Sequence, residues 1–376
     1  MSSSGNWKSS LSALDRYDAV RKIQSSLGPA RTASDAIAIE QEAYGISSTR
    51  DEYDAACASA AHQPPPSRPD IAVSPHDAVR IGPYDGCIFV AEGVTSEVYR
   101  AGDFALKVIT TAHRSMEPHN PQREAKILNM LRPPCIPLLD VFRDQEQQLV
   151  LRFPFMPLAL AQLLAAGPLS KQQLRVIFTD TLRALEHIHA RGIIHRDIKP
   201  SAVLLSSPSG PAFLSDFGTA WHPELSAHSE PAADKILDIG TGPYRAPEVL
   251  FGNKAYGPPV DMWGFGVMLA EAICSPPVPP FESRPVDEDG NQLGLILSIF
   301  KTLGTPTPET WPEARHFKVS PFELWTVFPP RSWPEILPQA DPLFRDLVSA
   351  LVRYDGQRAS ATTALGFPCL AAEGNE

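Results

Sequence analysis

Two short motifs that each contain an aspartate constrain this chain of 376 residues more than any other feature. The first is the tripeptide His-Arg-Asp at 195–197, and the second is Asp-Phe-Gly at 216–218. The apolar runs at 202–205 and 212–214 between them are typical of two short strands. A single three-residue match often arises by chance, whereas two matches in this order, with strands between them, do not. We therefore interpret the two tripeptides as parts of one functional site.

The first tripeptide resembles the catalytic loop of protein kinases, and the second resembles their metal-binding loop. This resemblance implies an enzyme that transfers the γ-phosphoryl group of ATP with the help of Mg²⁺. In that role Asp197 orients the attacking hydroxyl and accepts its proton, while Asp216 holds the metal on the ATP phosphates. Lys199, two residues after Asp197, is placed to reach the transferred phosphate. That lysine resembles serine/threonine kinases rather than tyrosine kinases.

The resemblance extends to the segment that covers the phosphates. The turn at 91–98 lies where protein kinases have a glycine-rich loop, but only Gly93 is kept, and Ala91 replaces one of the other glycines. Lys107 matches the lysine that neutralises the α- and β-phosphates of ATP. Glu124 matches the helix residue that pairs with this lysine and keeps it charged. The alternative for Glu124 is an ordinary surface pair within its own helix.

The adenine pocket is also implied by the resemblance. It assigns Val98, Ala105 and Leu204 to the two sides of the ring, Phe153 to the rear of the pocket, and the backbone of Pro154 and Met156 to the edge of the base. Pro154 has no N–H group, but only its carbonyl is needed in this role. Apolar residues in strands are core residues by default, so these assignments depend wholly on the family resemblance.

The catalytic loop departs from the kinase pattern at one position. Five residues after Asp197, kinases of this type place an asparagine that holds a second metal ion, and this chain has Ala202 there. Alanine offers no oxygen to a metal and no hydrogen bond to Asp197. Two interpretations follow: an enzyme with weak or single-metal catalysis, or a pseudokinase that serves as a scaffold. We favour the enzyme, because the other polar groups are kept and one such group contributes roughly a few kcal/mol.

Several later segments resemble the cyclin-dependent kinase branch of the family. The sequence Tyr-Arg-Ala-Pro-Glu at 244–248 ends the activation segment in the form typical of that branch. The run at 299–312 resembles the insert of cyclin-dependent kinases and is the most specific marker in the chain. The motifs at 261–263 and 357–361 also match, and the resemblance covers about residues 80–371. It implies a structural ion pair between Arg358 and Glu248, which belong to two of these motifs.

Two features set the chain apart from ordinary cyclin-dependent kinases. The sequence at 119–124 is not a cyclin-binding sequence, and the position of the activating phosphothreonine is occupied by Ile236. Asp234 and Asp238 are candidates for the negative charge that Arg196 would otherwise take from a phosphate. The alternative is that both are simply solvated acids of a loop.

A member of this branch without cyclin and without phosphorylation resembles the divergent single-subunit CDK-activating kinases of fungi. The resemblance implies a protein substrate that is itself a cyclin-dependent kinase, and no required cyclin. Thr241 is then the family's threonine that steadies Asp197 and Lys199, rather than a modification site. Two rivals stay open: a pseudokinase scaffold, and an ordinary cyclin-requiring kinase.

Composition bounds the partners and the compartment. The net charge of −10 and the pI near 5.5 argue against a nucleic-acid or anionic-membrane partner. The longest apolar stretch, at 262–273, is too short and too polar to span a bilayer. The five cysteines have no metal-binding spacing, and their odd number favours free thiols in a reducing compartment. We expect a soluble protein of the cytoplasm, the nucleus or both.

The chain divides into two parts by composition. Residues 1–78 form an N-terminal extension with expected helices at 11–27 and 33–44 and a Pro-rich linker at 62–69. Residues 79–372 form the kinase domain, an α+β bilobal fold with a small β-rich N-lobe at 79–154 and a larger α-helical C-lobe at 155–372. The expected strands are at 87–90, 97–100, 104–109, 137–142 and 148–153. The expected helices of this domain are at 122–131, 159–166, 171–191, 260–273, 293–303 and 343–352.

Overall fold

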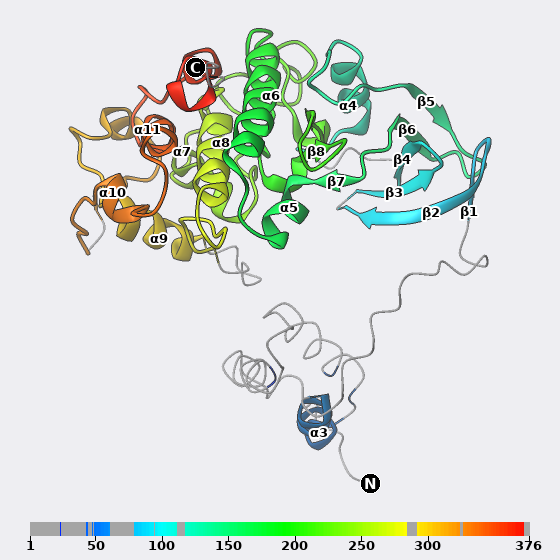
Figure 1. Ribbon diagram of the computed structural model, residues 1–376, viewed down its shortest axis with the longest axis horizontal. Helices are drawn as coiled ribbons and strands as arrows, with labels where there is room; N and C mark the ends of the chain where they lie inside the picture. The colour runs from blue at the N-terminus through cyan, green and yellow to red at the C-terminus, as the bar shows by residue number, and fades with distance from the viewer. Residues whose placement is uncertain are drawn as a thin grey trace. The chain divides into compact units, whose positions relative to one another are not determined.

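The computed structural model describes Ile23, Ala43, Ser47 and residues 49–60, 79–93, 95–110, 117–283, 292–323 and 326–371. By their internal contacts, residues 1–74 and 75–376 form two units. In the first unit, helix α3 (Arg50–Ala60; Figure 1) was not expected from the sequence. It buries Tyr53 and Cys57 one turn apart. Apart from Ile23 and Ala43, the expected helices at 11–27 and 33–44 and the linker at 62–69 lie outside the described residues.

The small lobe of the second unit is a six-stranded antiparallel sheet in the order β1-β2-β3-β4-β6-β5 (Figure 1). Its strands are β1 (Val79–Ile81), β2 (Tyr84–Glu92), β3 (Ser96–Ala101), β4 (Phe104–Ile109), β5 (Asp140–Arg143) and β6 (Leu149–Pro154). Leu106 and Val108 of β4 join Val150 of β6 in a small core on one side of the sheet. Because side chains alternate along a strand, Lys107 points to the opposite face.

Helix α4 (Pro121–Leu128) is the helix of the small lobe. The side chain of Asn120 caps it by accepting the Arg123 backbone N–H at 3.0 Å, and Pro121 occupies the first helical position. The helix ends before the expected boundary at 131. The reason is that Met130 and Leu131 donate their backbone N–H groups to carbonyls three residues back, which tightens the end into a turn.

The large lobe is a set of helices around α8 (Pro259–Ala272). Nearly every residue of α8 is buried, which explains its continuous apolar sequence. Helices α6 (Lys171–His189) and α11 (Pro342–Leu351) pack against it (Figure 1). The other described α-helices are α5 (Leu160–Ala166), α7 (Pro247–Leu250), α9 (Leu293–Leu303), α10 (Trp333–Ile336) and α12 (Ala361–Leu365). Short 3-10 turns are η2 (Pro200–Ala202), η3 (Phe217–Thr219), η4 (Gly242–Tyr244), η5 (Pro312–His316) and η6 (Pro368–Leu370).

A three-stranded sheet lies where the chain passes from the small lobe to the large one (Figure 1). Its strands are β7 (Leu158–Ala159), β8 (Val203–Leu205) and β9 (Ala212–Leu214), in the order β7-β8-β9. Strands β8 and β9 are antiparallel, with Val203 opposite Leu214. The loop with Asp197 leads into β8, and the turn with Asp216 follows β9. The hairpin therefore brings the two acidic tripeptides to the same end.

The expected α+β bilobal fold is confirmed. The expected strands and helices of the second unit are found within three residues of their expected ends. The five cysteines, all of them among the described residues, form no disulfide. Within the described part of the chain, none of the helices has both the length and the apolarity that crossing a bilayer requires.

Candidate active site

The loop before β8 is fastened to helix α8. One carboxylate, Asp261, accepts the backbone N–H groups of His195 and Arg196, each at 2.8 Å, and is 1% exposed. The His195 ring bonds the carbonyl of Ser215 at 2.8 Å and lies 4.8 Å from the ring of Phe217. Hydrogen bonds to a buried carboxylate are strong, so the backbone of this loop is held in place by the core of the large lobe.

A lysine and two carboxylates meet between the lobes. The Nζ atom of Lys107 lies 2.7 and 3.0 Å from the two oxygens of Glu124 and 3.2 Å from Oδ1 of Asp216. Burial lowers the pKa of Lys107, but the two carboxylates outweigh it and leave that pKa above its ordinary value. The Lys107 charge lowers the pKa of Asp216 to about 2. The Glu124 side chain is 3% exposed, which excludes the alternative of a surface helix pair.

A second cluster surrounds Asp197. The Nζ atom of Lys199 donates to Oδ2 of Asp197 at 2.5 Å, and the hydroxyl of Thr241 donates to Oδ1 at 2.7 Å. Lys199 also donates to the Thr241 oxygen at 3.0 Å. Each of the three side chains therefore holds the other two, and each oxygen of the Asp197 carboxylate has a fixed partner.

Strand pairing places five of the expected ATP-binding residues on one face of the small sheet. Val98 lies opposite both Ala91 and Lys107, and Ala105 lies opposite Phe153. Residues paired across antiparallel strands share a face, and so do residues two apart along one strand. Ala91, Val98, Ala105, Lys107 and Phe153 therefore point the same way, toward the side where Glu124 meets Lys107.

The remaining expected ATP-binding residues lie around this face. Pro154 ends β6, Met156 packs against the main core, and Leu204 is a half-buried residue of β8. The backbone N–H of Gly93 bonds the carbonyl of Ser96 at 2.7 Å and closes the turn between β2 and β3. A Cβ at Gly93 would meet ordinary contacts at 3.5 Å. The turn itself therefore does not require glycine.

Comparison with known proteins agrees with this geometry. The family model of the protein kinase domain matches residues 89–369. The chain belongs to the protein kinases. Serine/threonine-protein kinase csk1 of Schizosaccharomyces pombe is 36% identical over 299 residues, which cover 75% of this chain and 93% of that protein.

Two further proteins are similar to this kinase. The probable serine/threonine-protein kinase glkA of Dictyostelium discoideum is 31% identical over 296 residues, which cover 77% of this chain and 59% of that protein. The crystal structure of the yeast RNA Pol II CTD kinase CTDK-1 complex contains a chain with a TM-score of 0.62 and 26% identity, covering 75% of this chain and 91% of that one. The relatives identify the enzyme as a serine/threonine kinase.

Ala202 contributes only its backbone to the site of this kinase. It is 1% exposed, and its carbonyl accepts both the backbone N–H and the hydroxyl of Ser215, at 2.8 and 2.9 Å. These bonds join the catalytic loop to the residue before Asp216. Among the described residues there is no cluster of three or more histidine, cysteine, aspartate or glutamate side chains that could hold a metal. Asp216 is the one side chain that the sequence predicts as a metal ligand.

The charge that faces Arg196 comes from a residue that sequence reasoning did not single out. Arg196 forms a two-point ion pair with Glu230, at 2.6 and 3.1 Å, and both side chains are fully buried. Asp234 and Asp238 are themselves exposed and pair instead with Lys254 and Arg245. The hypothesis that either of them serves Arg196 is therefore wrong, and the alternative of solvated loop acids is confirmed. Residue spacing carries no signal for the observed pair, because 34 positions of mostly irregular chain separate its members.

The expected ion pair at the end of the activation segment is present. Arg358 donates to both oxygens of Glu248, at 2.7 and 3.2 Å. It also donates to the carbonyls of Pro259 and Arg353 and lies 5.1 Å above the ring of Trp263. The pair thus ties the end of the activation segment to helix α8.

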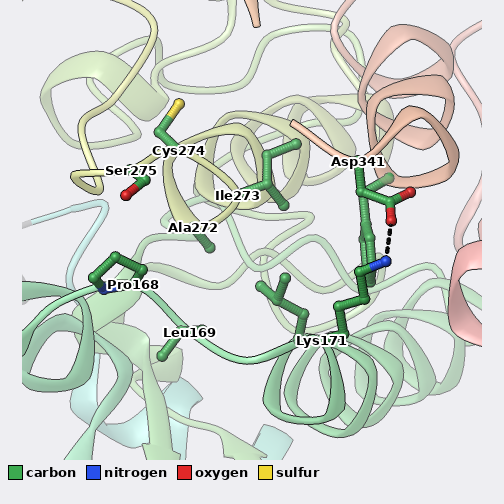
Figure 2. A pocket seen from close by; sticks show the side chains of 10 residues that line it. Pro168, Leu169, Lys171, Ala272, Ile273, Cys274, Ser275 and Asp341 are labelled. Atoms are coloured by element: carbon green, nitrogen blue, oxygen red, sulfur yellow. Dashed lines mark ion pairs between the residues drawn. The ribbon is translucent and has the colours of Figure 1, made fainter. Parts of the chain in front are cut away.

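A hollow of the large lobe lies away from these clusters. It is lined by residues near the start of α6, the end of α8 and the start of α11 (Figure 2). Its two charged side chains, Lys171 and Asp341, pair with each other at 2.6 Å, and Asp341 also caps α11. Both charges serve to fasten α11 to α6, so this hollow offers no unpaired charge to a nucleotide.

Proposed function

We propose that this kinase transfers the γ-phosphoryl group of Mg-ATP to a serine or threonine of another kinase, of the cyclin-dependent type, and needs no cyclin. The observation that carries the proposal is the pair of clusters formed within this one chain. Lys107 with its two carboxylates suits the anionic phosphates, and Asp197 with Lys199 and Thr241 suits the acceptor hydroxyl.

The chemistry follows from these side chains. A bond forms between the substrate oxygen and the γ-phosphorus, and the bond from that phosphorus to the β–γ bridging oxygen breaks, so that ADP leaves. Asp197 orients the hydroxyl and accepts its proton, while Thr241 holds the carboxylate. Lys199 balances the charge of the transferred group, and Lys107 balances that of the α- and β-phosphates.

The residues present fit one magnesium ion better than two. Asp216 offers an ionised carboxylate that is half exposed, as a ligand for a hard cation should be. When bound, the ion neutralises charge on the ATP phosphates. Ala202 removes the ligand that kinases of this type use for a second ion.

The contacts of α4 support independence from a cyclin. Asn120, at its start, donates its backbone N–H to the carbonyl of Gly218 at 3.0 Å. Arg123 donates to Glu117 at 2.9 Å and to the carbonyl of Pro118 at 2.5 Å. The bond from Asn120 to Gly218 ties the start of α4 to the Asp-Phe-Gly turn within the chain, which supports a helix position that is set without a partner.

The substrate class rests on sequence markers of the cyclin-dependent branch together with Ile236 at the phosphothreonine position. Both features resemble the CDK-activating kinases. The similarity to a CTD kinase suggests a second substrate class, a peptide of the RNA polymerase II CTD.

The test is a phosphorylation assay with the purified full-length chain. It is incubated with Mg-ATP and an unphosphorylated cyclin-dependent kinase, in parallel with a CTD peptide, and no cyclin is added for the enzyme. We expect incorporation into the activation-loop threonine of the substrate kinase, and a loss of about a hundredfold or more in Asp197→Asn.

Each of the other outcomes favours an alternative function or substrate. No incorporation, or incorporation that Asp197→Asn leaves unchanged, favours the pseudokinase scaffold. Activity that appears only with an added cyclin favours an ordinary cyclin-requiring kinase. Preference for the CTD peptide would mean that the proposed substrate class is wrong and that the proposed phosphoryl transfer is right.

A further inference from the structure

Glu230 lies at the centre of a buried ion cluster in the activation segment. Its side chain is 0% exposed, pairs with Arg196 at 2.6 and 3.1 Å, and lies 3.6 Å from Nη1 of Arg123. The backbone N–H of Ile236 donates to the same carboxylate at 3.0 Å. We refer to Arg123, Arg196 and Glu230 as the Glu230 cluster.

The Glu230 cluster joins three elements that must be aligned for phosphoryl transfer. Arg123 directly precedes Glu124 on helix α4, and Arg196 directly precedes Asp197 in the catalytic loop. Glu230 itself belongs to the activation segment. A shift of any one of these elements would separate buried opposite charges, so the cluster opposes such shifts.

The carboxylate is what holds the two arginines together. Burial raises the pKa of Glu230, but the bonds and charge of Arg196 outweigh it and leave that pKa below its ordinary value. Glu230 is therefore ionised at neutral pH. The remaining donors of Arg196 bond the carbonyl of Thr219 and the hydroxyl of Tyr256, which fixes the direction of the guanidinium. Without Glu230, the buried guanidinium of Arg196 would lose its counter-charge, and Arg123 would keep only Glu117.

We propose that Glu230 is a positioning residue that keeps this kinase active without any phosphate on the activation segment. The position of the activating phosphothreonine holds Ile236, whose side chain cannot be phosphorylated and whose N–H bonds Glu230 instead. The carboxylate supplies to Arg123 and Arg196 the negative charge that phosphorylation supplies elsewhere. This proposal rests on the proposed phosphoryl transfer, but it does not depend on which substrate accepts the phosphoryl group.

The first test removes the charge of Glu230 and keeps its shape. In the full-length chain, Glu230→Gln should lower kcat at least tenfold at a temperature where circular dichroism shows the variant to be folded. Backbone amide exchange over 121–128 should become faster, because Arg123 loses its carboxylate partner in the activation segment and keeps only Glu117, just before the helix. The matched control is Asp234→Asn, which removes an exposed carboxylate of the same segment and should change both quantities less than twofold.

If Glu230 only stabilises the fold and does not position the active site, the Glu230→Gln variant behaves differently. The Glu230→Gln variant would then unfold at a lower temperature but keep its kcat and its exchange in α4 while folded, and this result would overturn the proposal. The exchange measurement needs no catalysis. Failure of the positioning role can therefore be told apart from failure of the proposed function.

The second test uses the wild type and does not depend on the folding of a variant. Treatment with a non-specific phosphatase, verified by intact mass, should leave kcat within twofold of the untreated value. A loss of tenfold or more would show that phosphate on the chain is needed, and the proposal would be wrong.

Discussion

At the scale of single residues, Thr241 and Lys199 together fix the orientation of the Asp197 carboxylate. It bonds one carboxylate oxygen, Lys199 bonds the other, and the two partners are bonded to each other. Rotation of the carboxylate would break both bonds. We therefore expect the hydroxyl of Thr241 to act on the direction of proton transfer rather than on the binding of ATP.

Replacing this threonine tests that role. Hydrogen bonds to charged groups contribute about 1.5–3 kcal/mol, so Thr241→Ala should lower kcat about tenfold to a hundredfold. The KM for ATP should stay nearly constant, because the Lys107 cluster is untouched. The control is Thr241→Ser, which keeps the hydroxyl and most of the activity. Steady-state kinetics with varied ATP would contradict this account if KM rose and kcat did not fall.

Position 202 tests the missing metal ligand. Ala202→Asn supplies the amide that kinases of this type use, and we expect kcat to rise about tenfold at saturating Mg²⁺. Because Ala202 is buried, added bulk has its own cost there. The matched variant Ala202→Leu adds similar bulk without an oxygen. The idea fails if the asparagine variant is no faster than the leucine variant over a range of Mg²⁺ concentrations.

The sequence could predict those site residues that lie within motifs. Lys199 and Asp197 are two positions apart, and the resemblance supplied Lys107 with Glu124, whose ion pair the structure contains. Glu230 could not be found this way. Its partner lies in another element, and nothing local distinguishes it from the exposed acids that follow it in the same segment.

At the scale of elements, helix α4 depends on the charge of Glu230 in a way that pH reveals. A carboxyl group whose pKa is lowered by folding stabilises the folded state at pH values above its ordinary pKa. This contribution is lost as the pH falls through the lowered pKa of the folded state. At pH 7, removing one partner of a buried ion pair costs about 3–5 kcal/mol. We therefore expect Glu230→Gln to unfold at a lower temperature than the wild type at pH 7.

The difference between the two proteins should shrink as pH falls below about 4.5, where an ordinary glutamate becomes protonated. The charged groups around Glu230 are Arg123, Arg196, Lys235 and Glu117. The three basic ones stay protonated in this range, and Glu117 is common to both proteins. Thermal unfolding from pH 7 to about pH 3 measures the difference. A difference that is constant with pH would mean that shape rather than charge is lost.

Elements were predicted where periodicity is strong and missed where it is weak. The strands and the long helices follow from apolar patterns, and Lys107 alternates with buried neighbours as a two-sided strand requires. The end of α4 was placed too late, because the turn at Met130 continues the apolar pattern while its hydrogen bonds change. Helix α3 was missed, since its sequence is rich in alanine and acidic residues and shows little periodicity.

At the scale of the whole molecule, ligand binding should report on the assembled site. A ligand at a hundred times its Kd stabilises the folded state by about 2.7 kcal/mol. For a domain of this size that corresponds to a rise of roughly 4–5 °C in Tm. We expect Mg-ATP to raise Tm by this amount, and chelation with EDTA to remove most of the rise.

The charge of Asp216 should account for the magnesium-dependent part of this rise in Tm. In Asp216→Asn we expect ATP to give the same small shift with and without Mg²⁺. The exposed loop acid Asp238, replaced by asparagine, is the control and should behave like the wild type. If the Asp216→Asn variant responds to Mg²⁺ as the wild type does, the ion is bound elsewhere.

The attachment of the catalytic loop to Asp261 of helix α8 has a consequence for motion between the lobes. The loop that carries Asp197 is bonded to helix α8 of the large lobe, whereas Lys107 and Glu124 belong to the small lobe. Hinge opening therefore stretches the Lys107–Asp216 contact and leaves the Asp197 triad intact. We therefore expect an opening of the lobes to weaken nucleotide binding while the Asp197 carboxylate keeps its orientation.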